Sequence, residues 1–293
     1  MLNLNSIERA LRKYADCKDA DVAARLAIFG ALIHKAAQLS QQLSPLVAEF
    51  SDADLEAACR GEKVLLRDAH LTIDSESFEK SLRSMAQTFV EAAGLDGEMR
   101  AACEEVDWGS YAVPALLKLA STDPMKYLES IEILSPDEDL LDLYVLPVIG
   151  YTLRAYLDAT ATAASGKMAA MRADTVHEER QMNCPVCGGD PSIAAVVGTN
   201  THGNVKKLYC TCCGANWQFE RIRCATCGDE ATSDLTYVHD EGDQAHRLHV
   251  CKGCGAAMPT VFAGEELQFN PDIEQIVMSG LESFWAENHQ EPS

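Results

Sequence analysis

Hydrophobic residues recur at helical spacing through most of the first 164 residues. The segments Asp21–Leu43, Asp52–Arg60 and Glu76–Ala93 each place apolar side chains three or four positions apart. A glycine, Gly61 or Gly94, follows the second and the third segment directly. Glycine commonly ends a helix because it adopts positive φ without a steric penalty. The pattern therefore predicts an all-α N-terminal region.

The longest apolar run extends from Glu138 to about Ala164 and predicts a buried central helix. A membrane span needs about 20 consecutive apolar residues. Asp142, Pro147 and Arg154 interrupt this run. We therefore expect a helix inside the protein core, with no membrane span and with a kink at Pro147.

The pattern changes from about residue 184, where short β-branched or alternating stretches are separated by Gly, Asn and Asp. Trp217 and Phe219 alternate to one face and predict a small core there. Asn270-Pro271 then starts a final helix. The expected strands are Ser192–Gly198, Lys206–Tyr209, Asn216–Ile222, Leu235–His239, Leu248–Val250 and Thr260–Ala263, and the expected helix is Asp272–Asn288.

Eight of the 12 cysteines form four C-x-x-C pairs, each followed directly by glycine. The first two pairs recur after a shift of 40 or 41 residues. Two such turns can supply the four thiolates of a tetrahedral metal site. The repeat predicts two independent sites, whereas crosswise pairing would place Cys213 and Cys224 on one ion. The expected ligands are Cys184, Cys187, Cys210 and Cys213 for the first site, and Cys224, Cys227, Cys251 and Cys254 for the second.

Two properties of these sites stay open at the level of the residues. Cys212 could replace Cys213 as a ligand, although Cys213 is the residue that completes C-x-x-C-G. Tetrahedral four-sulfur sites hold either zinc or iron. Four thiolates leave no open coordination position, which favours a structural metal over a catalytic one. We expect the nearby histidines to be exposed or hydrogen-bonded rather than ligands: His202, His239, His246 and His249.

Charge and motifs restrict the functions further. Residues 1–183 hold 18 Lys and Arg against 30 Asp and Glu, and the whole chain has a formal net charge of −21. A nucleic-acid binder needs a basic footprint, which this charge distribution disfavours. The sequence contains no phosphate-binding loop, nucleophile elbow or H-E-x-x-H motif. We therefore expect no enzymatic activity.

These patterns predict an α+β multidomain protein. An all-α N-terminal domain is followed by two tandem rubredoxin-like or zinc-ribbon-like β modules and a C-terminal helix. The helical domain and the ribbons are expected to have separate cores. The expected parts are a helical domain (1–164), a polar linker or helical extension (165–183), a first metal ribbon (184–222), a second metal ribbon (223–264) and a C-terminal helix (265–293).

The cysteine segment resembles the formate dehydrogenase accessory protein family, FdhE, specifically over about residues 182–262. An acidic helical half of matching size precedes this segment. The resemblance rests on Cys184-Pro-Val-Cys187-Gly188, on Leu208-Tyr209-Cys210, on the Trp217-centred strand that runs to Cys224, and on Cys251-x-x-Cys254-Gly255.

This resemblance implies a non-catalytic protein that is needed for the maturation or activity of respiratory formate dehydrogenase and contacts its catalytic subunit. It also implies rubredoxin-like iron at the four cysteine pairs. Residues Met1–Asp16 lack the apolar segment of a signal peptide, which together with the metal-type cysteines favours the cytoplasm. Two alternatives are a rubredoxin-like electron-transfer module and, against the charge distribution, a zinc-ribbon nucleic-acid binder. The sequence does not indicate the oligomeric state.

Overall fold

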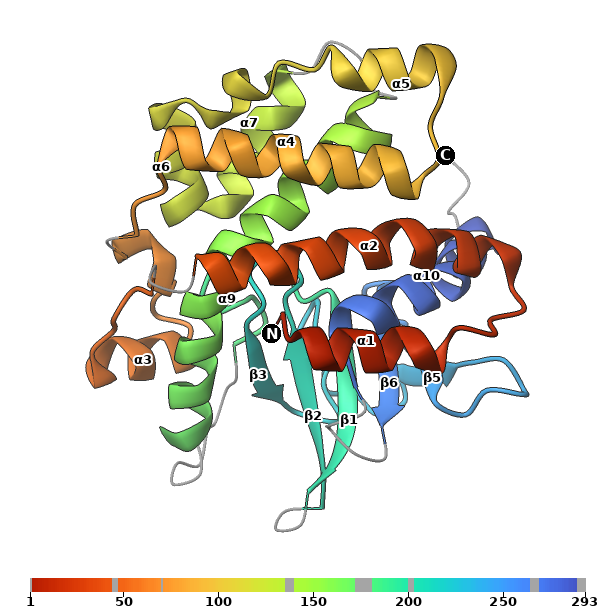
Figure 1. Cartoon of the computed structure of the whole chain (residues 1–293). Helices are drawn as coiled ribbons and strands as arrows, with labels where there is room; N and C mark the ends of the chain where they lie inside the picture. Colours follow the sequence, from red (N-terminus) through yellow and green to blue (C-terminus); the bar gives the residue numbers. More distant parts are fainter. Residues whose placement is uncertain are drawn as a thin grey trace.

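A helical N-terminal region, a mixed sheet and a closing helix follow one another along the chain (Figure 1). This computed structural model describes residues 2–43, 47–69, 71–134, 140–171, 181–199, 203–263 and 269–288. The expected fold class is confirmed. The expected boundary between residues 264 and 265, His202, and much of the expected linker (172–180) lie outside the described residues.

The helical region contains both α-helices and short tighter or wider turns. Its α-helices are α1 (Leu4–Lys13), α2 (Ala20–Gln42), α3 (Asp52–Cys59), α4 (Ser75–Ala92), α5 (Gly97–Glu104), α6 (Pro114–Thr122), α7 (Pro124–Leu134) and α9 (Leu146–Met171). The shorter elements are the 3-10 turns η1 (Leu65–Asp68) and η2 (Trp108–Ala112) and the π-helical turn η3 (Leu141–Val145).

Helix α4 shows how local sequence sets these elements. The Asp74 carboxylate accepts a hydrogen bond from the Ser77 backbone N–H at 2.8 Å and caps the first turn. Phe78 and Leu82 are completely buried on one face. Gly94, which follows the helix, has a φ of 61°. The predicted helix Glu76–Ala93 is thus confirmed, with both ends shifted by one residue.

Helix α9 is the central helix, and a π-helical turn directly precedes it. Pro147 has no backbone N–H to donate to the preceding turn, so the wider turn η3 occurs where we expected a kink. Leu153 and Leu157 are completely buried. Arg154 is also buried, with an exposed fraction of 1%. A charged side chain in this position needs partners, which are described with the metal centres.

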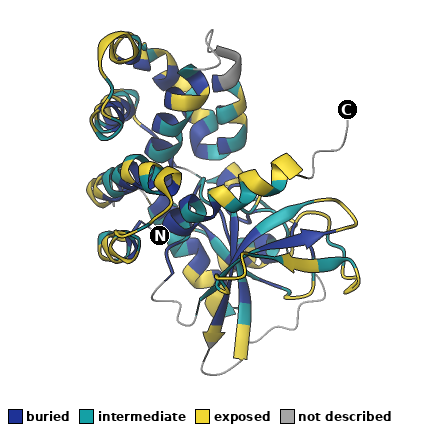
Figure 2. Ribbon diagram, turned by 90° about the vertical axis from the view of Figure 1, so that its right-hand side faces the viewer, coloured by how far each residue is buried: buried dark blue, intermediate teal, exposed yellow. Residues whose placement is uncertain are grey.

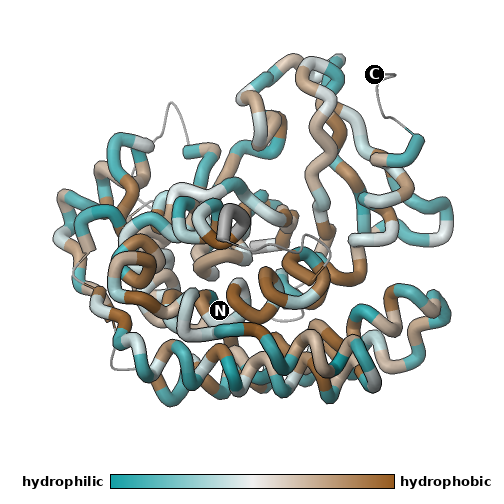
Figure 3. Tube along the Cα trace, turned by 90° about the horizontal axis from the view of Figure 1, so that it is seen from above, coloured by the Kyte–Doolittle hydropathy of each residue, from teal (hydrophilic) through white to brown (hydrophobic). Residues whose placement is uncertain are grey.

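Among the described residues, one helix has the length and composition of a membrane span, and it is α2 rather than the run around α9. It packs against α4, α9 and α10 (Pro271–Asn288). Leu32, Ile33 and Ala36 of α2 are completely buried. This burial is what a core helix of a globular protein shows. Figure 3 shows the corresponding alternation of hydrophobic and hydrophilic residues along the helices at the border of the molecule.

Six strands form one mixed sheet in the order β3-β2-β1-β6-β5-β4. The predicted strands are confirmed, with ends that differ by a few residues. Strands β1 and β6 run parallel, with Ala194 opposite Thr260, and all other neighbours are antiparallel. The strands are β1 (Ile193–Thr199), β2 (Gly203–Tyr209), β3 (Asn216–Phe219), β4 (Leu235–Val238), β5 (His246–Cys251) and β6 (Ala257–Ala263).

The two halves of the sequence repeat form two three-stranded units of the sheet, which are related by a translation. Strands β1 to β3 form one antiparallel meander and β4 to β6 form the next. The first strand of one meander pairs with the last strand of the other. The first and third strands of an antiparallel meander run in the same direction, so translation makes this junction parallel. Translation also places the equivalent cysteine turns at the same end of the sheet.

The first meander and the helices share one core, which corrects the expectation of separate cores. Leu32 of α2 and Leu153 of α9 belong to the same buried cluster as Cys184, Cys213 and Trp217. The other face of the sheet packs against α10 through a second cluster. Strand β1 is therefore buried on both faces, and the exposed ends of the β1–β2 hairpin point away from the helices (Figure 2).

A polar network ties the N-terminus to α10 and to β5. The buried Glu274 carboxylate accepts hydrogen bonds from the Tyr14 hydroxyl and, at 2.9 Å, from the Lys13 ammonium. His246 bridges Glu274 at 2.8 Å and Asp243. Burial alone would lower the pKa of His246, but its hydrogen bonds to these two carboxylates raise the pKa above its usual value. The protonated imidazole therefore holds three segments of the chain together.

This network predicts a pH-dependent stability. Because the folded-state pKa of His246 is raised, its contribution is fully present below about pH 6.5 and is lost as the pH rises through the folded-state pKa. We expect His246→Gln to be less stable than the wild type at about pH 6 and to show a smaller loss of stability towards pH 9. Urea unfolding at a series of pH values measures this, with half-buried His239→Gln, whose ring contacts the neighbouring Asp240 carbonyl, as the control. Equal pH slopes in the wild type and His246→Gln would contradict the assignment.

Candidate metal centres

The four C-x-x-C-G turns adopt one backbone geometry. In each, the glycine N–H donates to the carbonyl of the first cysteine, at 2.8 to 3.1 Å, and the N–H of that cysteine donates to the carbonyl five residues later. The four glycines have φ values of 82° (Gly188), 89° (Gly214), 78° (Gly228) and 75° (Gly255). Only glycine adopts this region readily, so the glycine after each pair is required by the turn. Such turns point backbone N–H groups at sulfur, as at Cys184 Sγ, which lies 3.5 Å from the Cys187 nitrogen.

The structure brings the eight cysteines together in the expected two quartets. The thiols of each quartet all lie within 4.8 Å of one another, and all described cysteines are free of disulfides. Cys213 and Cys224 belong to different groups, as the repeat implies. Metal ligation by these residues stays a prediction. The first group is Cys184, Cys187, Cys210 and Cys213, and the second is Cys224, Cys227, Cys251 and Cys254.

The spacing of the sulfurs fits a tetrahedral metal ion. With a metal–sulfur distance of about 2.3 Å, two sulfurs of such a site are about 3.8 Å apart. The closest cross-turn pairs are 3.5 Å apart in the first group (Cys184 to Cys213) and 3.7 Å apart in the second (Cys224 to Cys254). Each group can therefore close around its own ion with small shifts of the sulfur atoms.

The first group, called site one, is built into the core. All four of its cysteines are buried. Its first turn is also tied to the helical region, because Leu65 and Leu66 of η1 donate backbone hydrogen bonds to the carbonyls of Pro185 and Val186 at 3.0 and 2.9 Å. Burial raises the pKa of Cys184 well above its usual value. Four thiolates are thus costly here without a cation, which a metal ion would supply.

The second group, called site two, lies at the outer part of the sheet and is partly open. Cys227 and Cys254 are exposed, while Cys224 and Cys251 are buried. Burial raises the pKa of Cys224, but hydrogen bonds from the backbone N–H groups of Cys227 and Thr226 outweigh it and lower the pKa to about 7. A thiolate at this position is therefore available to a metal near neutral pH.

A buried arginine lies against site one. Arg154 of α9 is 3.0 Å from the Asp158 carboxylate and 3.5 Å from that of Asp272 on α10. Its guanidinium occupies the space beside Gly214, where a Cβ atom would lie 1.3 Å from Nη1. Burial alone would lower the pKa of Arg154, but Asp272 and Asp158 raise it. The positive charge next to the Cys213 turn can offset the excess negative charge of a four-thiolate site.

A second buried cation lies near site two. Lys206 of β2 is completely buried, and its Nζ lies 3.2 Å from His249 Nδ1. Burial lowers the pKa of Lys206 to about 8. Burial and the nearby charge of Lys206 lower the pKa of His249 to about 4. The neutral imidazole can therefore accept a hydrogen bond from the ammonium. His249 is thus hydrogen-bonded, which is one of the two states expected for these histidines.

The sequence prediction missed Arg154 and Lys206 as part of the surroundings of the sites. Arg154 had a visible signal, since a charged residue in an apolar helical run needs buried partners. Its partner Asp272 is 118 residues away, so the pair could not be assigned from spacing. Cys212 lies outside the first quartet and lines a pocket instead, which leaves Cys213 in the position expected for the ligand.

Comparisons with known proteins agree with this fold. No protein-family model matches the chain. Proteins named FdhE homolog are similar to it: one from Aquifex aeolicus is 27% identical over 104 residues, and one from Rhizobium meliloti is 22% identical over 160 residues. These matches cover 36% and 52% of this chain, and the same shares of the two relatives. The chain is thus matched to about a third to a half of the length of these relatives.

The same fold occurs in a solved structure. The crystal structure of the FdhE protein from Pseudomonas aeruginosa aligns with 98% of this chain and 91% of its own, with a TM-score of 0.53 and 17% sequence identity. This likeness of fold covers the helical region and the closing helix as well as the sheet. Together, the curated relatives and the shared fold confirm the resemblance to the FdhE family noted in the sequence.

Proposed function

We propose that this protein is a non-catalytic accessory factor for the maturation of respiratory formate dehydrogenase and that it binds the catalytic subunit of that enzyme. The observation that carries the proposal is the pair of four-thiol groups in C-x-x-C-G turns within a fold shared with an FdhE protein. A closed four-thiolate site has no open coordination position for a substrate. The turns therefore serve as a scaffold rather than as a reaction centre. We place this role in the cytoplasm.

Two metal ions complete the proposed protein, one at each site. The eight ligands are the cysteines of the two quartets. The family resemblance favours rubredoxin-like iron, and zinc fits the same four-sulfur geometry. At site one, a metal ion would join the first two turns inside the core that also contains α2 and α9. Metal binding at site one would therefore hold the sheet and the helices in one rigid platform for the client.

A second candidate function is electron transfer by an iron centre of the rubredoxin type. The observation that favours it is the exposure of Cys227 and Cys254, which brings site two to the surface. Site one has no comparable exposure. The two functions differ in their tolerance of zinc, since zinc has no redox chemistry. A client-binding scaffold keeps its function with zinc at both sites, and an electron carrier does not.

The proposal predicts a stable or transient complex with the catalytic subunit. We expect the purified protein to retain the immature catalytic subunit in a pull-down, and we expect Cys184→Ser or Cys224→Ser to weaken retention about tenfold or more. Cys17→Ser is the matched control, because Cys17 lies outside both quartets and its thiol contacts the Asp19 carbonyl. Zinc-loaded protein should retain the subunit as well as iron-loaded protein.

Two results would speak against this function. The first is restored dehydrogenase activity with no detectable complex, even after chemical cross-linking. The second is loss of function on zinc loading with the complex intact, which would select the electron-transfer alternative. The acidic charge of −21 makes a nucleic-acid partner a poor fit to this protein.

A further inference from the structure

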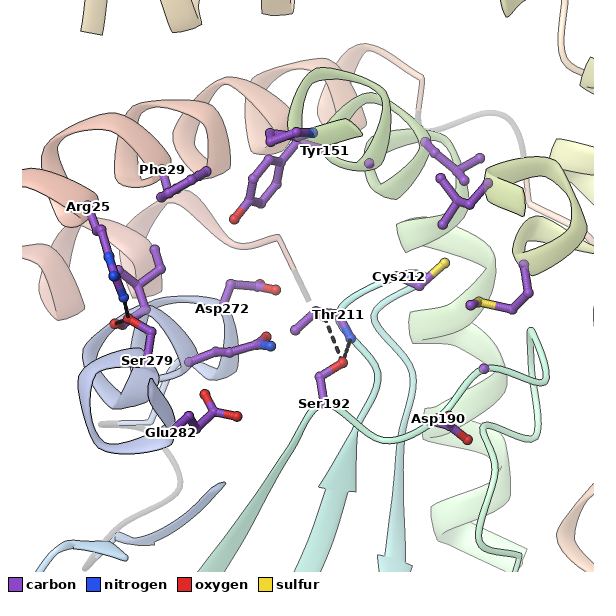
Figure 4. Close-up of a pocket in the computed structure, with 18 of the residues that line it drawn as sticks. Arg25, Phe29, Tyr151, Asp190, Ser192, Thr211, Cys212, Asp272, Ser279 and Glu282 are labelled. Atoms are coloured by element: carbon purple, nitrogen blue, oxygen red, sulfur yellow. Dashed lines mark hydrogen bonds between the residues drawn. The ribbon is translucent and has the colours of Figure 1, made fainter. Parts of the chain in front are cut away.

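A pocket of about 770 Å³ lies beside site one. Helices α2, α9 and α10 form its walls, and residues within or directly after the turns of site one form its floor (Figure 4). Thr211 and Cys212 belong to this floor, together with Ser192 at the start of β1. The Thr211 backbone N–H and hydroxyl both contact the Ser192 hydroxyl, at 3.2 and 2.8 Å, which keeps the floor ordered. A volume of this size holds several side chains of a ligand.

The walls of the pocket are mainly apolar. Phe29 and Ile276 line it from α2 and α10, and Pro147 of α9 and Leu128 of α7 line it as well. Leu143 at the pocket has an exposed fraction of 66%, the largest among the exposed large hydrophobic side chains of the described residues. This apolar surface extends to the outside of the pocket. Such a surface favours a protein segment that runs across the rim and inserts side chains.

One carboxylate in the pocket has no partner among the described residues. Among the charged lining residues, Arg25 donates a 2.6 Å hydrogen bond to Ser279, and Asp272 is held by Arg154. The Glu282 carboxylate points into the pocket in Figure 4, and no hydrogen bond or ion pair joins it to the part of the chain that the structure describes. Burial raises the pKa of Glu282 to about 7. A desolvated carboxyl group of this kind gains most from a cationic partner.

We propose that this pocket binds an extended segment of the client protein in which a lysine or arginine lies next to a bulky apolar side chain. The basic side chain pairs with Glu282, and the apolar side chain packs between Phe29 and Ile276. The Tyr151 hydroxyl, which is directed into the pocket, is placed to hydrogen-bond the backbone of the segment. This inference rests on the proposed client-binding function and adds the chemistry that selects the segment.

The pocket also adjoins the proposed metal at site one. Gly189 follows the first turn of site one and lines the pocket, as do Thr211 and Cys212 of the second turn. Loss of metal at site one would therefore disturb the floor of the pocket. Loss of site one should for this reason weaken segment binding more than loss of site two does.

The glycines of α9 offer a matched pair of variants. Gly150 lines the pocket, and a Cβ atom added there meets no other atom within 4 Å. Gly150→Leu therefore adds an apolar side chain at the pocket, and its Cβ meets no atom of the wall. Gly166 lies in the same helix with equally free space but is outside the pocket, so Gly166→Leu is the control. Leucine has a higher helix propensity than glycine, so both variants should fold at least as well as the wild type.

The experiment measures binding of the immature catalytic subunit and of overlapping synthetic peptides that cover it. We expect Gly150→Leu to weaken binding of both about tenfold or more and Gly166→Leu to leave it unchanged. Only peptides with a basic residue beside a bulky apolar residue should bind the wild type.

The charge at residue 282 is tested separately. Glu282→Lys should lower the affinity for these peptides about tenfold at low salt, and this loss of affinity should be smaller at high salt. Exposed Glu287→Lys is the control. Peptides with glutamate in place of the basic residue should prefer Glu282→Lys.

The outcomes separate this inference from the proposed function. If the whole subunit binds the wild type and Gly150→Leu equally, the pocket is not the site, and the client-binding function stands. If the subunit and all peptides fail to bind the wild type, both the function and the inference fail. Equal affinity of the peptides for the wild type and for Glu282→Lys would overturn the pairing of the basic side chain with Glu282.

Discussion

Replacing Cys210 with serine should destabilise the entire fold, whereas replacing Cys251 should loosen mainly the outer meander. The two cysteines are equivalent in the repeat, since each begins the second turn of its site. Cys210 belongs to the core that contains α2 and α9. Cys251 belongs to site two, where two of the four cysteines are exposed. Losing one ligand removes part of a binding free energy on the order of 10 kcal/mol, which is comparable to the stability of a whole domain.

Thermal unfolding, metal analysis and limited proteolysis measure this contrast. We expect each variant to lose one of two metal ions, and the absorption spectrum and elemental content of the anaerobically purified proteins identify the metal. Cys251→Ser should be cleaved within residues 228–262 while the helices keep their unfolding temperature. Cys210→Ser should lower the unfolding temperature of the helices as well. Equal effects of the two substitutions would refute the unequal integration of the two sites.

Replacing Arg154 with methionine should have the second largest effect on stability. The substitution leaves Asp158 and Asp272 buried without their cation, with side chains 9% and 4% exposed. Breaking a buried ion pair by removing one partner costs about 3–5 kcal/mol. For a chain of this size we expect the unfolding temperature to fall by about 5 to 15 °C. Arg154→Met should also retain less metal at site one, because the guanidinium lies against the Gly214 turn.

A surface arginine provides the control for Arg154. Arg12 pairs with Glu8 one helical turn away, but its side chain is 69% exposed. Surface pairs of this kind contribute less than about 1 kcal/mol, so Arg12→Met should change stability little. Adding Asp158→Asn and Asp272→Asn to Arg154→Met should recover part of the loss, because the unpaired charges are then removed. A triple variant as unstable as Arg154→Met would contradict this electrostatic account.

The predicted secondary structure was most successful where local signals agreed. Helix α4 has an aspartate cap, an apolar face and a glycine after its end, and these signals lie within about 20 residues of one another. Strand β3 was predicted from Trp217 and Phe219, which are both buried in the structure. The π-helical turn before Pro147 could not be predicted in form, because a proline indicates a disturbed helix without saying how the chain absorbs it.

The packing of the helical region against the sheet had weaker signals in the sequence. We expected separate cores for the helices and the ribbons, yet Ser165 of α9 accepts a 3.0 Å hydrogen bond from the Asn216 backbone of β3. Trp217 donates to the carbonyl of Gln181 at 2.7 Å. Such contacts join residues 36 to 51 positions apart and leave no periodic trace in the sequence. A core shared between regions is therefore difficult to distinguish from two smaller cores by pattern alone.

The sequence by itself determined the grouping of the cysteines and the need for glycine after each pair. These properties depend on hydrogen bonds within six residues, such as that from Gly188 to Cys184 at 2.8 Å, and on a repeat that pairs neighbouring turns. The tertiary structure alone decided that site one is buried and site two partly open. It did so by pairing β1 with β6, placing α10 against the sheet and setting Arg154 beside Gly214. Burial and charge at a site are sums over contacts between distant segments, and local residue patterns do not specify those contacts.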